Sequence, residues 1–156
     1  AKGGSISFVM VPIILMAIRW GLTAGLATGL LIGIMQMMFG AYIVHWLQAI
    51  LDYGLAFTVV GLAAVIRKPL LQATQSLHKT KMALYIIIGT LLGGALRFVC
   101  HLLAGVVFFK EFAGDDNVWT YSILYNGSYM LPATIITAII AVLLFTSAPR
   151  LLQKVQ

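Results

Sequence analysis

The sequence predicts an all-α fold, a polytopic bundle of membrane helices that forms a single domain over residues 1–156. Of its residues 62% are hydrophobic and 9% are charged, and its mean hydropathy is +1.03. Soluble domains carry about a quarter charged residues, so this composition cannot supply a water-exposed surface. At 156 residues, the chain has room for about five spans of ~20 residues joined by short loops.

Five apolar segments account for these spans, at residues 6–18, 22–39, 42–66, 82–109 and 121–145. The first segment is short for a full crossing, and Pro12 within it is a candidate for a helix kink. Residues 67–81 mix leucines with Gln, Ser, Thr and Lys, which predicts a short interfacial helix or loop between the third and fourth spans.

The net charge of +6 comes from cations whose positions along the chain indicate how its spans are oriented. The cations lie at the ends of apolar runs instead of alternating along a basic face, so no nucleic-acid partner is expected. Five alternating spans place most of them on one side, which the positive-inside rule makes cytoplasmic together with the C-terminus. Lys2 and the loop 110–117 fall on the opposite side. The cytoplasmic set is Arg19, Arg67, Lys68, Lys79, Lys81, Arg150 and Lys154.

Glycines recur every four residues in the second segment, at Gly21, Gly25, Gly29 and Gly33. This spacing makes a smooth stripe on one helix face, against which another helix can pack closely. Residues 89–94 repeat the pattern in the fourth segment. Packing inside this fold is favoured for both stripes over docking of a separate partner.

Two polar stripes lie at membrane depth. Asp52 is the one acid inside an apolar segment, and a carboxylate there is costly unless it is paired or lines a wet cavity. His45 and Gln48 share its helix face at spacings i, i+3, i+7, while Arg97, His101 and Gly105 share a face of the fourth segment. The structural alternative is that Asp52 and Arg97 pair to fix helix register and that His101 is a core histidine.

The fifth segment begins with a stretch that is too polar for lipid contact, from Trp119 to Tyr129. Trp119 and Tyr129 themselves are expected to belong to an interfacial aromatic belt. Asn126 needs hydrogen-bond partners at its depth, and Tyr121 and Tyr125 flank it.

Together these residues offer a carboxylate, an imidazole, an amide, phenols and the ring of Phe109. That set suits a small, flat, polar heterocycle with cationic character. The sequence contains no Ser-His-Asp order, nucleotide-binding glycine loop or metal-ligand spacing, and the single Cys100 is expected as a small core residue. Ligand binding is therefore expected, with neither enzymatic activity nor a cofactor.

Four separated stretches, at 21–36, 48–57, 97–109 and 121–131, carry a family resemblance. They read GLTAGLATGLLIGIMQ, QAILDYGLAF, RFVCHLLAGVVFF and YSILYNGSYML. In order and position they resemble the thiamin-specific S-components of energy-coupling-factor (ECF) vitamin importers, the ThiT or YuaJ family. The resemblance implies a six-helix bundle, of which this chain supplies five helices, with a vitamin site near the extracellular face.

The resemblance also implies roles for individual residues. Asp52, His101, Tyr121 and Asn126 would address the aminopyrimidine of thiamin, and Phe109 would stack on the thiazolium. Tyr53 and Gly105 would lie near the hydroxyethyl arm. Asp52 stands where Glu is found in the family and Phe109 where Trp is familiar, and Phe is the weaker platform for a cation. The family's first helix, which precedes residues 3–7, would carry a coupling surface, and the loop after it would contribute to the lid.

The resulting expectation is a thiamin-binding subunit in the cell membrane, surrounded by lipid, whose partners are a membrane coupling subunit and two cytosolic ATPases. One alternative is a stand-alone ion-coupled carrier that uses Asp52, Arg97 and His101 as a relay. The sequence shows no inverted repeats of the kind that such carriers use. The other alternative is an S-component for a different small heterocyclic vitamin.

Overall fold

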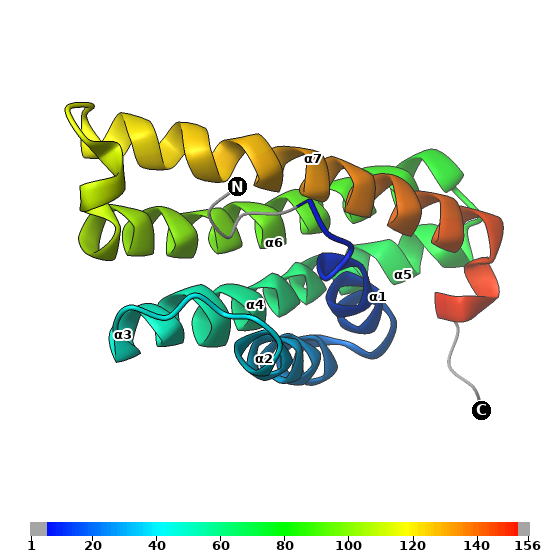
Figure 1. Cartoon of the computed structure of the whole chain (residues 1–156). Helices are drawn as coiled ribbons and strands as arrows, with labels where there is room; N and C mark the ends of the chain where they lie inside the picture. Colours follow the sequence, from blue (N-terminus) through cyan, green and yellow to red (C-terminus); the bar gives the residue numbers. More distant parts are fainter. Residues whose placement is uncertain (1–5, 153–156) are drawn as a thin grey trace.

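The computed structural model describes residues 6–152, and within that range every element is helical (Figure 1). The predicted all-α membrane bundle is confirmed. The expectations for Lys2 and Lys154 lie outside the described residues. The elements are α1 (Met10–Trp20), α2 (Leu22–Met38), α3 (Trp46–Ala49), the π-helix η1 (Ile50–Leu55), α4 (Ala56–Thr58), η2 (Val59–Ile66), α5 (Arg67–Gln75), α6 (Lys79–Phe108), η3 (Lys110–Ala113), α7 (Val118–Ser147) and η4 (Pro149–Leu152).

Among the described residues, three helices are long and apolar enough to cross a membrane: Trp46–Gln75, α6 and α7. The elements from α3 to α5 follow one another without interruption and form the first of these, called the third rod below. The sequence placed the end of this span at Ile66, whereas the helix continues through α5. Most of the segment predicted as an interfacial helix or loop at 67–81 is thus helical and continues the third rod, with a turn at Ser76–His78 before α6.

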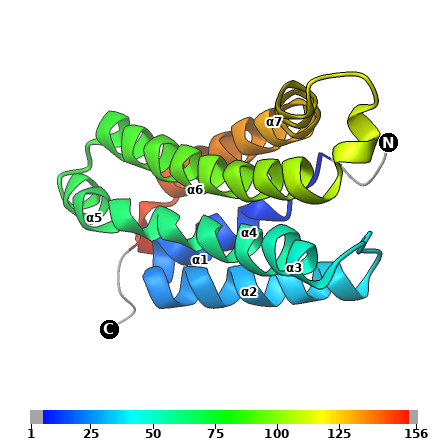
Figure 2. The same ribbon diagram turned by 90° about the vertical axis from the view of Figure 1, so that its left-hand side faces the viewer.

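The arrangement gives the bundle two distinct ends. The α6–α7 loop and the start of α3 lie at one end, here called the loop end (Figure 1). The α5–α6 turn and the end of α7 lie at the other end (Figure 1). It is called the cation end because α5 and the start of α6 carry Arg67, Lys68, Lys79 and Lys81. α2 runs along one side of the third rod, with α6 and α7 on the other side (Figure 2). The Arg67 guanidinium donates to the carbonyls of Ile18 and Arg19 at 3.1 Å each, which joins the end of α1 to the cation end.

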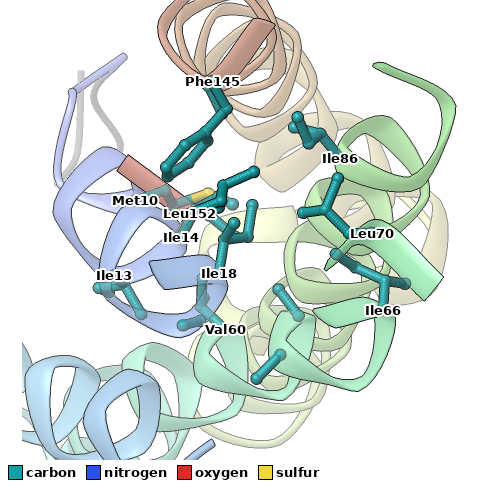
Figure 3. Close-up of a cluster of buried hydrophobic side chains, with 14 of the residues drawn as sticks. Met10, Ile13, Ile14, Ile18, Val60, Ile66, Leu70, Ile86, Phe145 and Leu152 are labelled. Carbon is teal, nitrogen blue, oxygen red and sulfur yellow. The ribbon is translucent and has the colours of Figure 1, made fainter. Parts of the chain in front are cut away.

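α1 fills the centre of the bundle at the cation end. Its residues Met10, Ile14 and Ile18 are fully buried and pack among Ile86, Phe145 and other apolar side chains (Figure 3). The 11 residues of α1 span about 16 Å, half of a ~30 Å hydrocarbon core. Pro12 lies in the first turn of α1, where its missing N–H needs no intrahelical partner. The helix therefore accommodates this proline without a kink.

The glycine stripes pack within the chain, as predicted. Gly25, Gly29 and Gly33 are buried on α2, and a Cβ on Gly29 or Gly33 would meet the carbonyl oxygen of Phe57 or Tyr53 in the third rod. In α6, a Cβ on Gly94 would meet the side chain of Thr134 on α7. Small residues therefore set the backbone separation between these helices. Cys100 is buried on α6, as expected.

Replacing Gly29 with Ala should destabilise the protein by about 1–3 kcal/mol, because the added methyl group lies 2.8 Å from Thr58 Cα and the rod must move. Thermal unfolding in detergent measures the change. Gly127→Ala is the matched control, since nothing lies within 4 Å of its added Cβ, and Ala favours the helix by up to ~1 kcal/mol. Equal stability of the two variants would contradict the close packing of α2.

Candidate functional site

A pocket of about 170 Å³ opens at the loop end, where α1 no longer fills the bundle. Ser7 and Val9, which directly precede α1, contribute to its lining, and most of the remainder comes from the third rod, α6 and α7. The pocket combines aromatic walls with a few polar side chains, which is the usual lining of a small-molecule site. The structure brings all seven sequence-predicted site residues to this pocket: Asp52, Tyr53, His101, Gly105, Phe109, Tyr121 and Asn126.

A chain of side-chain hydrogen bonds crosses the pocket and is centred on Asp52. His101 Nδ1 lies 2.7 Å from Asp52 Oδ1, and Gln48 Nε2 donates to Asp52 Oδ2 at 2.7 Å. Arg97 Nε donates to His101 Nε2 at 3.3 Å. A guanidinium can only donate, so Nε2 accepts and the ring proton sits on Nδ1, from which it points at the carboxylate.

Arg97 is joined to Asp52 through the ring of His101, and no direct ion pair between the two is present in the described part of the chain. The guanidinium also lies over the ring of Phe57, 4.4 Å from its centroid. The structural alternative of a direct Asp52–Arg97 pair is therefore wrong. The positive charge of Arg97 therefore compensates the buried carboxylate through His101 and not by direct contact. Asp52 still lines the pocket, where a ligand could meet it.

The backbone that carries Asp52 and Tyr53 is the π-helix η1, and π-turns often mark functional positions. Gln48 stands one α-helical turn before Asp52, so its amide reaches the carboxylate. The Tyr53 hydroxyl accepts a hydrogen bond from the Tyr42 N–H at 3.1 Å, from the loop between α2 and α3. Asp52 thus contacts His101 of α6, and Tyr53 contacts the loop between α2 and α3.

His45, predicted to share the face of Gln48 and Asp52, does not line the pocket. It precedes α3 as its N-cap, with Nδ1 accepting from the Leu47 N–H at 3.1 Å. Its ring stacks instead near Phe108, 5.2 Å between centroids. A residue before the first helical turn does not follow the helical period, so this part of the sequence prediction was wrong.

Asn126 anchors the α7 side of the pocket. Its Nδ2 donates to the Ser122 carbonyl at 2.9 Å, and its Oδ1 accepts from the Tyr129 hydroxyl at 2.6 Å. Tyr129 therefore belongs to the pocket, and its assignment to an aromatic belt was wrong. Tyr121 and Tyr125, the partners expected for Asn126, stack on each other at 5.9 Å with ring planes 7° apart. Trp119 is exposed, consistent with the belt.

Gly105 lets α7 approach α6 beside the pocket. A Cβ at this position would meet Ser122 Oγ and would lie 3.4 Å from Asn126 Nδ2. Ser122 Oγ in turn donates to the Leu102 carbonyl at 3.2 Å. The absent side chain therefore allows the Ser122–Asn126 pair to pack directly against α6.

Aromatic rings form the rim of the pocket. Phe109, at the end of α6, stacks with Tyr42 at 6.1 Å and lies 6.0 Å from Phe112 in η3. Tyr42 and Phe112 were not predicted as site residues, since they lie in connections where no helical period points inward. Phe57 was also missed, because an apolar residue in an apolar span gives no signal. Gln36 of α2 also lines the pocket without having been singled out. Four further lining residues were noted in the sequence only as polar residues at membrane depth: Gln48, Arg97, Ser122 and Tyr125.

These groups are arranged for recognition of a small polar ligand. Among residues 6–152, no buried side-chain N or O atom lacks a hydrogen-bond partner, so the buried polar groups beside the pocket are already oriented. The described residues also contain no group of three or more His, Cys, Asp or Glu side chains placed to hold a metal ion. A carboxylate, an imidazole and an amide at the floor and aromatic faces at the rim can bind a flat heterocycle that carries a positive charge.

Comparisons with known proteins agree on one family. The family model described as "Thiamine transporter protein (Thia_YuaJ)" matches residues 1–153. The thiamine transporter ThiT of Bacillus subtilis is 42% identical over 155 residues, covering 98% of this chain and 81% of the relative. ThiT of Lacticaseibacillus paracasei is 34% identical over 151 residues, covering 94% and 75%.

A solved structure of ThiT from Listeria monocytogenes superposes with a TM-score of 0.90 at 30% identity, covering 97% of this chain and 84% of that chain. The likeness thus extends from the sequence motifs to the whole helical arrangement. With a family model matching nearly its full length and relatives at 42% and 34% identity, this multi-pass membrane chain belongs to the thiamine transporter protein family.

Proposed function

We propose that the chain, acting as one domain over residues 1–156, captures thiamin in the loop-end pocket as the S-component of an ECF importer. The observation that carries this proposal is the buried Asp52 carboxylate, which faces an aromatic-rimmed pocket in a member of the thiamine transporter family. The relatives are named as transporters, so the chain is a transport protein and not an enzyme.

In the proposed complex, the aminopyrimidine binds at the floor, where Asp52, His101 and Asn126 are already oriented by their neighbours. Tyr121 contributes a phenol from the α7 side. The thiazolium cation stacks at the rim on Phe109, because the face of an aromatic ring attracts positive charge. Tyr53 and Gly105 lie beside the hydroxyethyl arm.

The proposed partners are a membrane coupling subunit and two cytosolic ATPases, because the sequence contains no ATP-binding motif. The cation end then faces the cytoplasm with the C-terminus, in agreement with the positive-inside rule. The loop end, and with it the pocket, opens to the outside. Import follows from reorientation of the loaded bundle by the coupling partners.

The hydrogen bonds around Asp52 do not favour an independent ion-coupled carrier. The chain of hydrogen bonds through Asp52 and His101 ends at Arg97 on one side and at the Gln48 amide on the other. Neither a guanidinium nor an amide releases a proton at physiological pH, so a relay stops at both. Below the pocket, α1 fills the bundle with buried apolar side chains. A different heterocyclic vitamin is the remaining alternative, and a titration in which such a vitamin competes with thiamin for the purified protein tests it.

Asp52→Asn should weaken thiamin binding by about 1.5–3 kcal/mol, the contribution of a hydrogen bond to a charged group. Isothermal titration of the purified protein measures the affinity. Asp115→Asn is the matched control, since it removes the same charge from an exposed position in the α6–α7 loop. Equal affinities for wild type and Asp52→Asn would remove the carboxylate from the ligand site.

Phe109→Trp should tighten thiamin binding and Phe109→Leu should weaken it, because the attraction between ring and thiazolium grows from Leu to Phe to Trp. Quenching of Trp fluorescence and calorimetry report the three affinities. Phe39→Leu, at an exposed position that does not line the pocket, controls for general effects of ring removal. The same affinity in all three proteins would show that the ring at 109 does not touch the ligand.

Purified protein in liposomes should bind thiamin without accumulating it, and a proton gradient should have no effect. Accumulation of radiolabelled thiamin should begin only when the coupling subunit, the ATPases and ATP are present. Gradient-driven uptake by the chain alone would overturn the S-component assignment.

A further inference from the structure

Gln48 is a buried amide whose role the proposed ligand contacts leave unexplained. Its side chain is 1% exposed, yet it makes polar contacts on two sides. Nε2 donates to Asp52 Oδ2 at 2.7 Å and to the Tyr42 carbonyl at 3.2 Å, while Oε1 accepts from the Val44 N–H at 3.2 Å. One amide thus joins the pocket carboxylate to the loop between α2 and α3.

The orientation of this amide is fixed by its partners. The Val44 N–H can only donate, so the oxygen of Gln48 must face the loop. The NH₂ group is then left for the two oxygens that it meets, the carboxylate of Asp52 and the carbonyl of Tyr42. A flipped amide would place its oxygen against both acceptors, so the contacts permit one orientation.

Both backbone polar groups of Tyr42 are hydrogen-bonded to side chains that line the pocket. Its carbonyl accepts from Gln48, and its N–H donates to the Tyr53 hydroxyl. The ring that this backbone carries lies on the rim, stacked with Phe109, and is 55% exposed. A side chain so exposed has few apolar contacts to fix it, so the two backbone tethers determine where the rim ring stands.

We propose that Gln48 is a positioning residue for ligand capture, which orients the Asp52 carboxylate and places the Tyr42 ring at the mouth of the pocket through the same amide. The inference rests on the proposed function, because thiamin is the ligand whose two rings these groups would meet. Floor and rim are then set together, so loss of the amide disturbs contacts to both parts of the ligand.

Gln48→Met keeps the length of the side chain and removes both polar ends. It should weaken thiamin binding about tenfold or more, the effect of losing a hydrogen bond to a charged group. In the Asp52→Asn background the further loss should be smaller than in wild type, since only the contacts of Gln48 to the loop between α2 and α3 are left to lose. Tyr53→Phe, which removes the other tether of Tyr42 and leaves the Gln48–Asp52 contact in place, should lose a similar factor in both backgrounds. Gln72→Met controls for loss of an amide at the cation end, where Gln72 is exposed.

Amide hydrogen exchange in the ligand-free protein tests the loop contacts without thiamin. Gln48→Met should speed exchange across residues 41–45 about tenfold or more and leave α7 unchanged. Should Met prevent folding, Gln48→Asn replaces it, because its shorter amide cannot span from Tyr42 to Asp52. Wild-type protein that does not bind thiamin would overturn the proposed function. If the wild type binds thiamin but the losses for Gln48→Met and Asp52→Asn multiply in full, Gln48 does not orient the carboxylate. If it binds thiamin but exchange at 41–45 is unchanged by Gln48→Met, the amide does not place Tyr42. Either result would overturn the joint role of Gln48 and leave the proposed function standing.

Discussion

The buried carboxylate of Asp52 is the constraint on which the loop end of the bundle depends. A charge at membrane depth costs several kcal/mol unless it is compensated and hydrogen-bonded. Here the compensation comes from α6, through His101 and Arg97, and the second oxygen is satisfied by Gln48 in the third rod. Satisfying the acid therefore fixes how α6 and the third rod face each other, and the pocket lies where they do.

The second constraint is the length of α1. Because this helix spans about half of the membrane, it fills the cation end with apolar side chains and leaves the loop end to polar ones. The same bundle thus has a tightly packed half and a half that can admit a ligand. Glycines on α2 and α6 let these helices approach the short helix closely, since a Cβ on Gly25 would meet Ala17 and one on Gly93 would lie 3.4 Å from Ile14.

The pocket also joins elements that differ in rigidity. Its floor is built on long helices, whereas Tyr42 and Phe112 at its rim come from connections. Connections have fewer packing contacts than helices and move more readily. In the proposed function a ligand would enter past the rim, while Asp52, His101 and Asn126 at the floor keep their orientation through their own hydrogen bonds.

Much of the fold and of the site follows from the sequence alone. Hydropathy and the position of cations determine the spans, because lipid excludes unsatisfied backbone and charge. Asp52, His101 and Asn126 are conspicuous for the same reason, since a polar group at that depth is costly unless it is paired or lines a cavity. The glycine stripe on α2 likewise predicts a close helix contact, and the structure places the third rod there.

What only the tertiary structure decided is which of these groups meet. Helical period gives the faces of one helix, but the rotation of one helix against another depends on packing between distant residues. Hence Arg97 reaches His101 instead of Asp52, and Tyr129 points to Asn126 instead of lipid. The period also fails where the backbone is not α-helical: His45 lies before the first turn, and η1 widens the helix around Asp52. The sequence determined that a polar site exists within the membrane, and the tertiary structure decided its partners, because hydrogen bonds between helices depend on distances that no local pattern encodes.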